Sequence, residues 1–332
     1  MEKRRVVVYG IGPIGARMIQ YIAGRDSLEI VGAVDIDPVK KGKDISEVAG
    51  LEKVSGIRIE SGAKSVLERS RPDIVVLTTT SSLEKIKPQV MEILGQGISI
   101  VSTCEELSYP WQTNPGIAGE IDSAAKEKGV SVLATGVNPG FLMDFLPIAA
   151  TGVCRKVEKI TVERVQDASK RRLPFQAKVG VGINAEEFNE RLKKGVLRHV
   201  GLTESIQMIA SKMGWKLDKT EDIVEPVIAS DRVSAGGRDI PKGGILGVRQ
   251  TGYGYAGGSA VITLLFIAAA GVEPQYDRIL VEGEPKIDMT IKDGVNGDIA
   301  TCAMVANAIP SVLKARPGLR TMADIEPVSC FA

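Results

Sequence analysis

The stretch "YGIGPIGARM", residues 9–18, decides the fold. It follows the apolar run "RRVVV", and Gly10, Gly12 and Gly15 match GxGxxG at the opening of a helix-like segment. In a dinucleotide-binding turn the first glycine makes the tight turn, the second admits the pyrophosphate, and the third lets the helix pack against the strand. The helix N-terminus then offers N–H groups to the phosphates. We therefore predict a dinucleotide-binding turn made by Gly10, Ile11, Gly12, Pro13, Ile14 and Gly15.

Asp35 bears on the choice of cofactor. It ends the next apolar run, where an acid accepts hydrogen bonds from the adenine-ribose diol and repels a 2′-phosphate. Lys40, Lys41 and Lys43 follow closely, either as phosphate ligands or as part of a solvated loop. The sequence therefore favours NAD and leaves use of NADP open.

Residues 1–136 alternate short β-branched runs with helix-like segments, which predicts a doubly wound parallel sheet, the Rossmann arrangement. The runs lack polar alternation, as expected of strands covered on both faces. Ser81 and Glu84 have the spacing of a capping box, and a second helix is expected across residues 114–129. The candidate strands are residues 4–10, 28–35, 73–79, 97–103 and 130–135.

Polar residues follow several of these strands at their carboxyl ends, where an open α/β sheet binds its ligand. Two adjacent acids, Glu105 and Glu106, follow one strand almost at once and are expected near the nicotinamide; the alternative is a helix cap. The chain has a single histidine, His199, so carboxylates are the main candidates for proton transfer. Further cofactor contacts are expected from Thr78, Thr79, Thr80, Thr103, Asn138 and Gly140.

The hydrophobic pattern of the sequence changes after residue 136. Long runs, several of them alternating in polarity, predict a second α+β domain over residues 137–295, built on a mostly antiparallel sheet with one open face. That open face is a natural homodimer surface. Residues 296–332 begin with an apolar helix expected to return to the nucleotide domain. Strands are expected at 156–168, 224–233, 244–255 and 259–269, and helices at 184–195, capped by Asn184 with Glu187, and 203–214.

Composition limits the class of protein. A net charge of +1 gives no reason to expect nucleic acid as a partner, and the longest apolar run, residues 259–272, is too short to span a membrane. No secretory signal is visible at the start. The four cysteines show no CxxC spacing, so neither a disulfide framework nor a metal site is expected, and a cytoplasmic location fits.

Several motifs together resemble one dehydrogenase family. "YGIGPIGARM", "AVDIDPVKKGKD", "STCEELSYPW", "TGVNPGFLMD", "RHVGLTESI" and "GDIATCAMVANAIP" are similar to those of the 2,4-diaminopentanoate dehydrogenases and the native amine dehydrogenases grouped with them. The resemblance runs nearly end to end. It is weaker to dihydrodipicolinate reductases, which share the architecture but carry paired histidines that this chain lacks.

The resemblance implies NAD(P)-dependent oxidative deamination of an amine or amino acid. For the diamino acid, the C4 amine would become a ketone, a step of anaerobic ornithine breakdown. By the same resemblance the glutamate in "TCEE" is the acid–base, assigned to Glu105 with Glu106 as the alternative. A dehydrogenase acting on another amino acid such as diaminopimelate, and a regulator that senses NAD without turnover, remain alternatives.

The substrate carries a carboxylate, for which arginine forks are the expected partners. Arg164, Arg171 and Arg172 are candidates. The expected substrate-binding set is completed by Phe141, Gln166, His199 and Tyr253.

Overall fold

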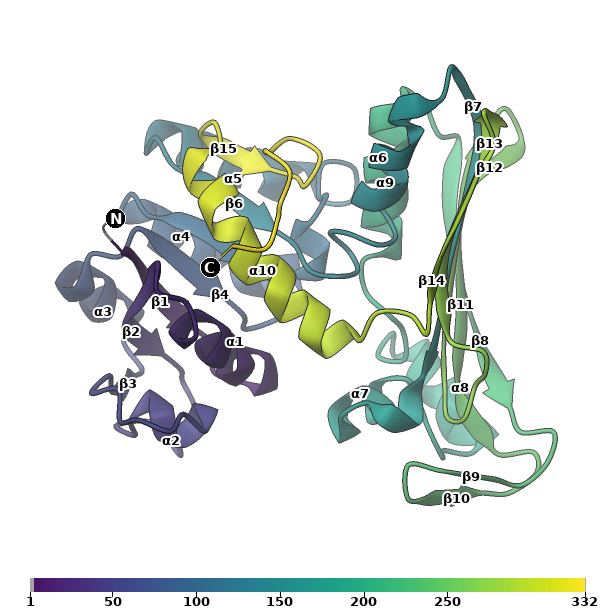
Figure 1. Ribbon diagram of the computed structural model, residues 1–332, viewed down its shortest axis with the longest axis horizontal. Helices are drawn as coiled ribbons and strands as arrows, with labels where there is room; N and C mark the ends of the chain where they lie inside the picture. The colour runs from purple at the N-terminus through teal and green to yellow at the C-terminus, as the bar shows by residue number, and fades with distance from the viewer. Residues whose placement is uncertain (1–2, 332) are drawn as a thin grey trace. The chain divides into compact units, whose positions relative to one another are not determined.

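The computed structural model describes residues 3–331 and divides into two compact units (Figure 1). Unit 1 holds the described residues up to Phe141 and those from Gly297 onward; unit 2 is Leu142–Asn296. The expected boundary at residue 136 falls inside a loop that packs within unit 1, because Val137 N donates to Thr301 Oγ1. The C-terminal segment, expected from residue 296, belongs to unit 1 from Gly297.

Unit 1 is built on a sheet of seven parallel strands in the order β15-β6-β5-β4-β1-β2-β3. Strands β2 and β3 are added on one side of β1, and β4, β5 and β6 on the other side. The strand order therefore reverses between β1 and β4, and such sheets bind their ligands at this switch point. The doubly wound parallel sheet predicted from the sequence is confirmed. The strands are β1 (Arg4–Tyr9), β2 (Leu28–Val34), β3 (Ile59–Glu60), β4 (Ile74–Leu77), β5 (Ser99–Ser102), β6 (Ser131–Ala134) and β15 (Gly318–Arg320).

Helices cover both faces of this sheet. Alternate strand residues such as Val7, Val75 and Ile100 form one buried core with the helices of one face, while α1 and α10 contact each other on the opposite face. The helices are α1 (Pro13–Ala23), α2 (Ile45–Ala49), α3 (Ala63–Ser70), α4 (Leu83–Gly95), α5 (Pro115–Glu127) and α10 (Gly297–Lys314), with a 3-10 turn η1 at Glu105–Leu107.

Unit 2 is built on a six-stranded sheet in the order β14-β13-β7-β12-β11-β8. Only β7 and β12 pair in parallel, so the expectation of a mostly antiparallel sheet is confirmed. Its strands are β7 (Lys156–Asp167), β8 (Lys219–Ile228), β11 (Ile245–Ala256), β12 (Ser259–Ala269), β13 (Tyr276–Glu284) and β14 (Ile287–Lys292), and a separate hairpin joins β9 (Val233–Ala235) to β10 (Arg238–Ile240).

Helices cover one face of the unit 2 sheet (Figure 1). A Cβ on Gly252 or Gly254 would lie 2.9 or 2.8 Å from Ile206 of α9, so these glycines let the helix settle on the strand. Asn184 caps α8 as expected, accepting from Glu187 N at 2.8 Å. The helices are α6 (Phe145–Ala150), α7 (Leu173–Lys178), α8 (Ala185–Lys193) and α9 (Leu202–Met213), with 3-10 turns η2 (Thr151–Val153) and η3 (Ala168–Lys170).

One expected strand is corrected: that at 224–233 runs instead over 219–228, because it pairs with β11 from Lys219 opposite Tyr255. Strands β13 and β14, together with the β9–β10 hairpin, were not anticipated. Pro310 lies inside α10, which continues to Lys314.

Candidate functional site

The glycine turn joins β1 to α1 with the geometry that the motif requires. Gly10 has a φ of +93°, and a Cβ on Gly15 would lie 1.9 Å from Gly10 O, so both positions exclude a side chain. A Cβ on Gly12 would meet nothing within 4 Å. Gly12 is also the N-cap residue of α1, and no side chain caps that helix. The space in front of Gly12 is therefore open, beside the uncapped N–H groups of a helix start.

Asp35 is bound into this turn. One carboxylate oxygen, Oδ2, accepts from Ile11 N at 2.6 Å and from Lys40 Nζ at 3.1 Å, and Oδ1 accepts from Asp37 N at 2.8 Å. Asp35 is 8% exposed. Lys40 also forms an ion pair with Asp37, at 3.3 Å. The Asp35 carboxylate, which we predict to contact the adenine ribose, is thus held in place with Lys40 beside it.

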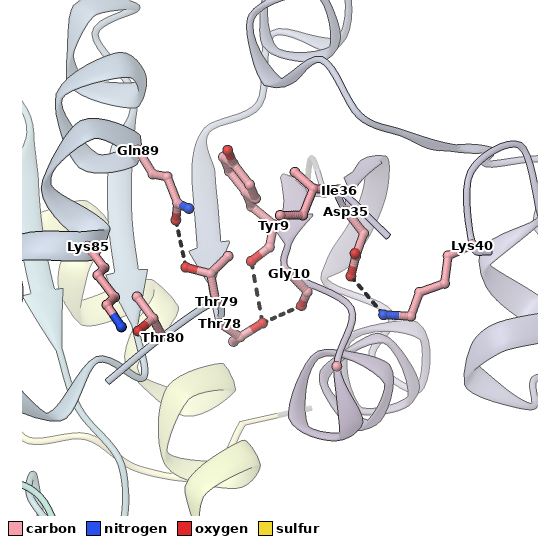
Figure 2. A pocket seen from close by; sticks show the side chains of 11 residues that line it. Tyr9, Gly10, Asp35, Ile36, Lys40, Thr78, Thr79, Thr80, Lys85 and Gln89 are labelled. Atoms are coloured by element: carbon pink, nitrogen blue, oxygen red, sulfur yellow. Dashed lines mark hydrogen bonds and ion pairs between the residues drawn. The ribbon is translucent and has the colours of Figure 1, made fainter. Parts of the chain in front are cut away.

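A cavity of about 330 Å³ opens between the glycine turn and α4 (Figure 2). Asp35 and Lys40 lie on one side of it, and Lys85 and Gln89 of α4 lie on the other. Its size is typical of small-molecule sites. The lining residues are Tyr9, Gly10, Gly12, Asp35, Ile36, Lys40, Thr78, Thr79, Thr80, Lys85 and Gln89.

The three threonines after β4 reach this cavity. Thr78 Oγ1 donates to Gly10 O at 2.5 Å, which ties the threonine segment to the glycine turn, and Thr79 Oγ1 lies 2.6 Å from Gln89 Oε1. Thr80 Oγ1 accepts from Ser82 N. We expected the threonines at the nicotinamide half of the cofactor. The structure places them in the same cavity as Asp35, and their contact with the nicotinamide half stays a prediction.

Glu105 and Glu106 open the 3-10 turn that follows β5, and both side chains are half-buried. Glu106 is engaged by α4: its Oε2 accepts from Leu83 N at 2.8 Å, and its own N donates to Ser81 O. The backbone of Glu105 is held by Ser108, whose N and Oγ both donate to Glu105 O. The two adjacent acids therefore have different surroundings.

The expected capping box of Ser81 and Glu84 does not form. The N-cap of α4 is Ser82, which makes no side-chain cap, and the free N–H of the first helical residue goes to Glu106 instead. Cys104, next to the acids, donates its thiol to Ser81 O at 3.2 Å. Burial raises the pKa of this thiol far above its ordinary range, so Cys104 is a packing residue and no nucleophile.

The loop after β6 is compact. A Cβ on Gly140, whose φ is +125°, would lie 2.5 Å from Gly136 N, so this glycine serves close packing of the loop on itself. Asn138 is 7% exposed. Thr135 Oγ1 is buried and has no hydrogen-bond partner among residues 3–331. An orphaned hydroxyl beside the predicted amide-binding loop fits a site for a polar ligand group.

The Arg164 side chain forms its contacts within unit 2. It is 2% exposed, donates to Asp277 Oδ1 at 2.7 Å and to Val295 O at 2.8 Å, and lies on the covered face of β7. Burial lowers its pKa to about 10, and burial likewise raises the pKa of Asp277. The expectation that Arg164 supplies an arginine fork to substrate is therefore corrected, because its guanidinium holds a structural ion pair.

Gln166, Arg171 and His199 lie near this pair. Arg171 Nη1 donates to Gln166 Oε1 at 2.7 Å, and its guanidinium stacks 4.0 Å from the Phe175 ring centroid. Burial, with the nearby charges of Lys178, Arg164 and Arg171, lowers the pKa of His199 to about 3. His199 is thus a neutral imidazole in cationic surroundings.

The backbone of His199 is fixed while part of its ring stays unsatisfied. Gln250, fully buried, accepts from His199 N at 2.7 Å and donates to His199 O at 3.0 Å. The ring lies 4.7 Å from Phe266, and Nδ1 has no hydrogen-bond partner among the described residues. A buried imidazole nitrogen without a partner is a natural contact for a ligand.

Tyr253 does not join this group within unit 2. It alternates along β11 with Gly252 and Gly254, whose Cα atoms face α9, so its side chain lies on the open face of the sheet. There it stacks near Tyr255 at 5.9 Å. Gln250, which contacts His199, is on the covered face. Phe141 is the last residue of the first segment of unit 1, and Arg172 is the N-cap residue of α7.

Comparison with known proteins shows the family. The 2,4-diaminopentanoate dehydrogenase C-terminal domain matches residues 141–331, and the N-terminal domain of dihydrodipicolinate reductase matches residues 4–103. A 2,4-diaminopentanoate dehydrogenase of Acetoanaerobium sticklandii is 36% identical over 98% of this chain and 94% of its own length. The chain belongs to the 2,4-diaminopentanoate dehydrogenase family.

Two amine dehydrogenases extend the comparison. One from Streptomyces virginiae is 22% identical over 96% of this chain and 95% of its own length. The structure of another, from Mycobacterium smegmatis, has a TM-score of 0.86 at 23% identity and covers 99% of this chain and 97% of that one. This likeness supports the fold described above, an NAD(P)-binding dehydrogenase fold with a second mixed-sheet domain.

In this member of the 2,4-diaminopentanoate dehydrogenase family, the structure also shows cavity residues that were not predicted from the sequence. Tyr9, Ile36, Lys85 and Gln89 line the cavity. Tyr9 is the last residue of β1 and Ile36 is the second residue after β2, so their places at the strand ends were a usable signal. Lys85 and Gln89 are four residues apart on α4 and share one helix face, a weaker signal because the facing element was unknown.

Within residues 3–331, no helix combines the length and the hydrophobicity of a membrane span. No group of three or more His, Cys, Asp or Glu side chains in that range is placed to hold a metal ion.

Proposed function

We propose that this chain catalyses the NAD(P)-dependent oxidative deamination of 2,4-diaminopentanoate at C4, giving 2-amino-4-oxopentanoate and ammonia. The full-length similarity to the Acetoanaerobium sticklandii enzyme supports the substrate and the reaction. The observation that carries the proposal is a glutamate, Glu105, directly after a parallel strand of the unit that holds the dinucleotide cavity. In the reverse direction the same site would aminate a ketone.

The reaction is balanced as follows. A protonated amine, oxidised cofactor and water become a ketone, reduced cofactor, ammonium and one proton. The cofactor, when bound, accepts the hydride from C4. The cavity and the open space before Gly12 fit its adenosine and pyrophosphate.

Glu105 is assigned the proton steps. Hydride can leave only from a carbon that bears a neutral amine, so a base must first take a proton from the ammonium group. Hydride transfer leaves a cationic iminium in the substrate, and release of the captured proton to solvent returns Glu105 to the carboxylate that stabilises this cation. The carboxylate then accepts a proton from the water that attacks the iminium carbon and passes it to the amino nitrogen. Ammonia leaves and takes up the hydroxyl proton as ammonium, which completes hydrolysis to the ketone.

The substrate carboxylate is assigned to Arg171 in place of Arg164. Gln166 and Phe175 orient the Arg171 guanidinium, and planar guanidinium groups bind carboxylates through two hydrogen bonds. His199, neutral and with Nδ1 unsatisfied, is assigned a hydrogen bond to the same end of the substrate. These roles would make an amino acid a better substrate than a simple amine.

The cofactor preference we propose is NAD, with use of NADP. Asp35 stands where the adenine-ribose diol binds, which favours NAD. Lys40 lines the same cavity and can exchange its contact with Asp35 for a 2′-phosphate, which admits NADP.

We also propose that the protein forms a cytoplasmic homodimer through the open face of the unit 2 sheet. This face carries apolar side chains such as Ile223, Leu265 and Leu280 between charged ones. Light scattering of the wild type and of Leu265→Arg would test it: a dimer that becomes a monomer supports the interface. A dimer that survives the substitution would place the contact elsewhere.

The proposed reaction is tested by reduction of NAD or NADP in the presence of 2,4-diaminopentanoate. Wild type should turn over. Glu105→Gln should bind the cofactor normally and lose at least about a hundredfold in kcat, the usual contribution of a general base. No turnover by the wild type, despite cofactor binding, would overturn the substrate assignment. A Glu105→Gln variant as active as wild type would overturn the role of Glu105.

A further inference from the structure

The Glu106 carboxylate caps the start of helix α4. Its carboxylate accepts the N–H of Leu83, the first residue of α4, from 23 positions away in the sequence. A carboxylate at this place satisfies one of the unpaired donors of the helix start and complements the positive end of its dipole. No side chain of the preceding segment does so, because Ser82 makes no cap.

The same contact is one of three that join the turn after β5 to residues 81–83. Cys104 Sγ and Glu106 N both donate to Ser81 O, at 3.2 and 3.3 Å, and Leu83 N donates to Glu106 Oε2. Glu105 lies between the two residues that make these bonds. Its backbone position is therefore set by the start of α4.

Helix α4 also forms one wall of the cofactor cavity. Lys85 and Gln89, on its first two turns, line the cavity with Thr79 and Thr80 of the preceding segment (Figure 2). Thr78 of that segment is bonded to Gly10 O in the glycine turn. A continuous set of contacts thus leads from the glycine turn, through residues 78–83, to Glu106.

We propose that Glu106 is a positioning residue and no acid–base: it clamps the turn that carries Glu105 to the helix that lines the cofactor cavity, so that cofactor binding and the placement of Glu105 depend on one contact. This rests on the proposed function for its kinetic part and on the structure alone for its cofactor part. A clamp needs an acceptor oxygen, whereas a proton carrier needs a carboxylate. Glutamine supplies the first and not the second.

The test compares Glu106→Gln, Glu106→Ala and Glu105→Gln, with Glu84→Ala as the matched control. Glu84 is an exposed acid on the first turn of the same helix and has no bond to the turn after β5 among the described contacts. Steady-state kinetics gives kcat and the KM for amine, and titration of NADH fluorescence gives the cofactor Kd. Thermal unfolding of each variant shows that it is folded.

Glu106→Gln should keep kcat within about threefold, because the amide oxygen still accepts from Leu83 N. Glu106→Ala should lose about tenfold or more in kcat, because Glu105 is no longer held in position. It should also weaken NADH binding about fivefold, because α4, which lines the cavity, loses its cap. Glu84→Ala should match the wild type. The KM for amine should change little in all of them.

Two results would overturn the proposal. If Glu106→Gln is as inactive as Glu105→Gln, Glu106 itself carries the proton. If Glu106→Ala binds NADH like the wild type, the contact does not link the helix to the cavity, whatever the kinetics. The NADH arm does not require turnover, so a failure of the proposed reaction is recognised separately by an inactive wild type.

Discussion

Two buried charges, one in each unit, find their partners in different ways. In unit 1 the Asp44 carboxylate accepts backbone N–H groups that lie within 12 residues of it along the chain. In unit 2 the buried Arg164 pairs with the side chain of Asp277 on a neighbouring strand, 113 residues away. The comparison shows one charge that is satisfied by its own loop and one that meets its partner only when the sheet is complete.

The largest effect is expected in unit 2. Arg164→Met leaves Asp277, 3% exposed, without its cation, and should lower the free energy of unfolding by about 3–5 kcal/mol in urea titrations. The matched control is Arg278→Met on neighbouring β13, whose partner Asp288 is exposed, with an expected change of about 0–1 kcal/mol. Combining Arg164→Met with Asp277→Leu should recover most of the loss. Equal effects of the two single substitutions would contradict the contrast between buried and exposed pairs.

In unit 1 the strongest backbone-held acid is Asp44. Its carboxylate accepts five hydrogen bonds, from Ser46 N and Oγ, Ser55 N and Oγ, and Gly56 N. Asp44→Ala should lower the free energy of unfolding by about 2 kcal/mol, because it removes both the cap of α2 and the anchor of the 55–56 turn. Chemical unfolding measures this, with Glu47→Ala on the same helix as control. A loss below about 0.5 kcal/mol would show that the loop closes without its acid.

The contribution of Asp44 should also depend on pH. Burial by itself would raise the pKa of Asp44, but the hydrogen bonds from Ser46 and Ser55 outweigh it and hold the pKa well below its usual range. The carboxylate therefore stabilises the fold fully above the ordinary aspartate pKa, and this stabilisation is lost as the pH falls towards the lower folded-state pKa. Unfolding of wild type and Asp44→Asn at pH 7 and pH 3 should show a smaller difference at pH 3. A difference that grows on acidification would have the wrong sign.

A smaller effect is expected at the cofactor. Lys40→Ala should raise the KM for NADP about tenfold, since one charge-assisted contact to the 2′-phosphate is lost, and should leave the KM for NAD within about twofold. The exposed neighbour Lys41 provides the control, because it does not line the cavity. Equal changes for both cofactors in Lys40→Ala would mean that Lys40 only holds Asp35.

The smallest effect is expected at His199, whose imidazole should show no titration near neutral pH. Because burial and the cations around it lower its pKa to about 3, the ring should stay neutral from pH 8 to pH 5 in the folded protein. The chain has one histidine, so a single set of imidazole NMR signals reports it directly. A titration near pH 6.5 would show that the ring is solvated and that unit 2 has no closed cationic site.

Sequence reasoning located what is local in the chain. The glycine turn, Asp35, the parallel strands and the Asn184 cap depend on residues a few positions apart, so their patterns are readable without the fold. The role of Glu106 was open, because the helix that it caps is reached through space. The Ser81–Glu84 spacing suggested a local cap, which lost to that distant carboxylate.

Contacts in unit 2 were harder to predict, because they too join residues that are far apart in the sequence. The partner of Arg164 lies on β13, a strand that the sequence did not reveal because charged residues such as Arg278 and Glu282 on its open face interrupt the apolar run. Tyr253 was expected in the same substrate-binding set as His199, whereas the alternation of β11 places its side chain on the other face of the sheet. Which face of a strand is buried depends on where the helices pack on the sheet.

The return of the chain to unit 1 also constrains how the protein is made. Helix α10 and strand β15 complete the cofactor unit: α10 contacts α1 and β4–β6, and β15 pairs with β6. Both are synthesised only after the whole of unit 2. During synthesis, β4–β6 therefore lack the cover of α10 and the β6 edge lacks its partner β15 until the last segment emerges, so unit 2 can fold before the cofactor sheet is complete.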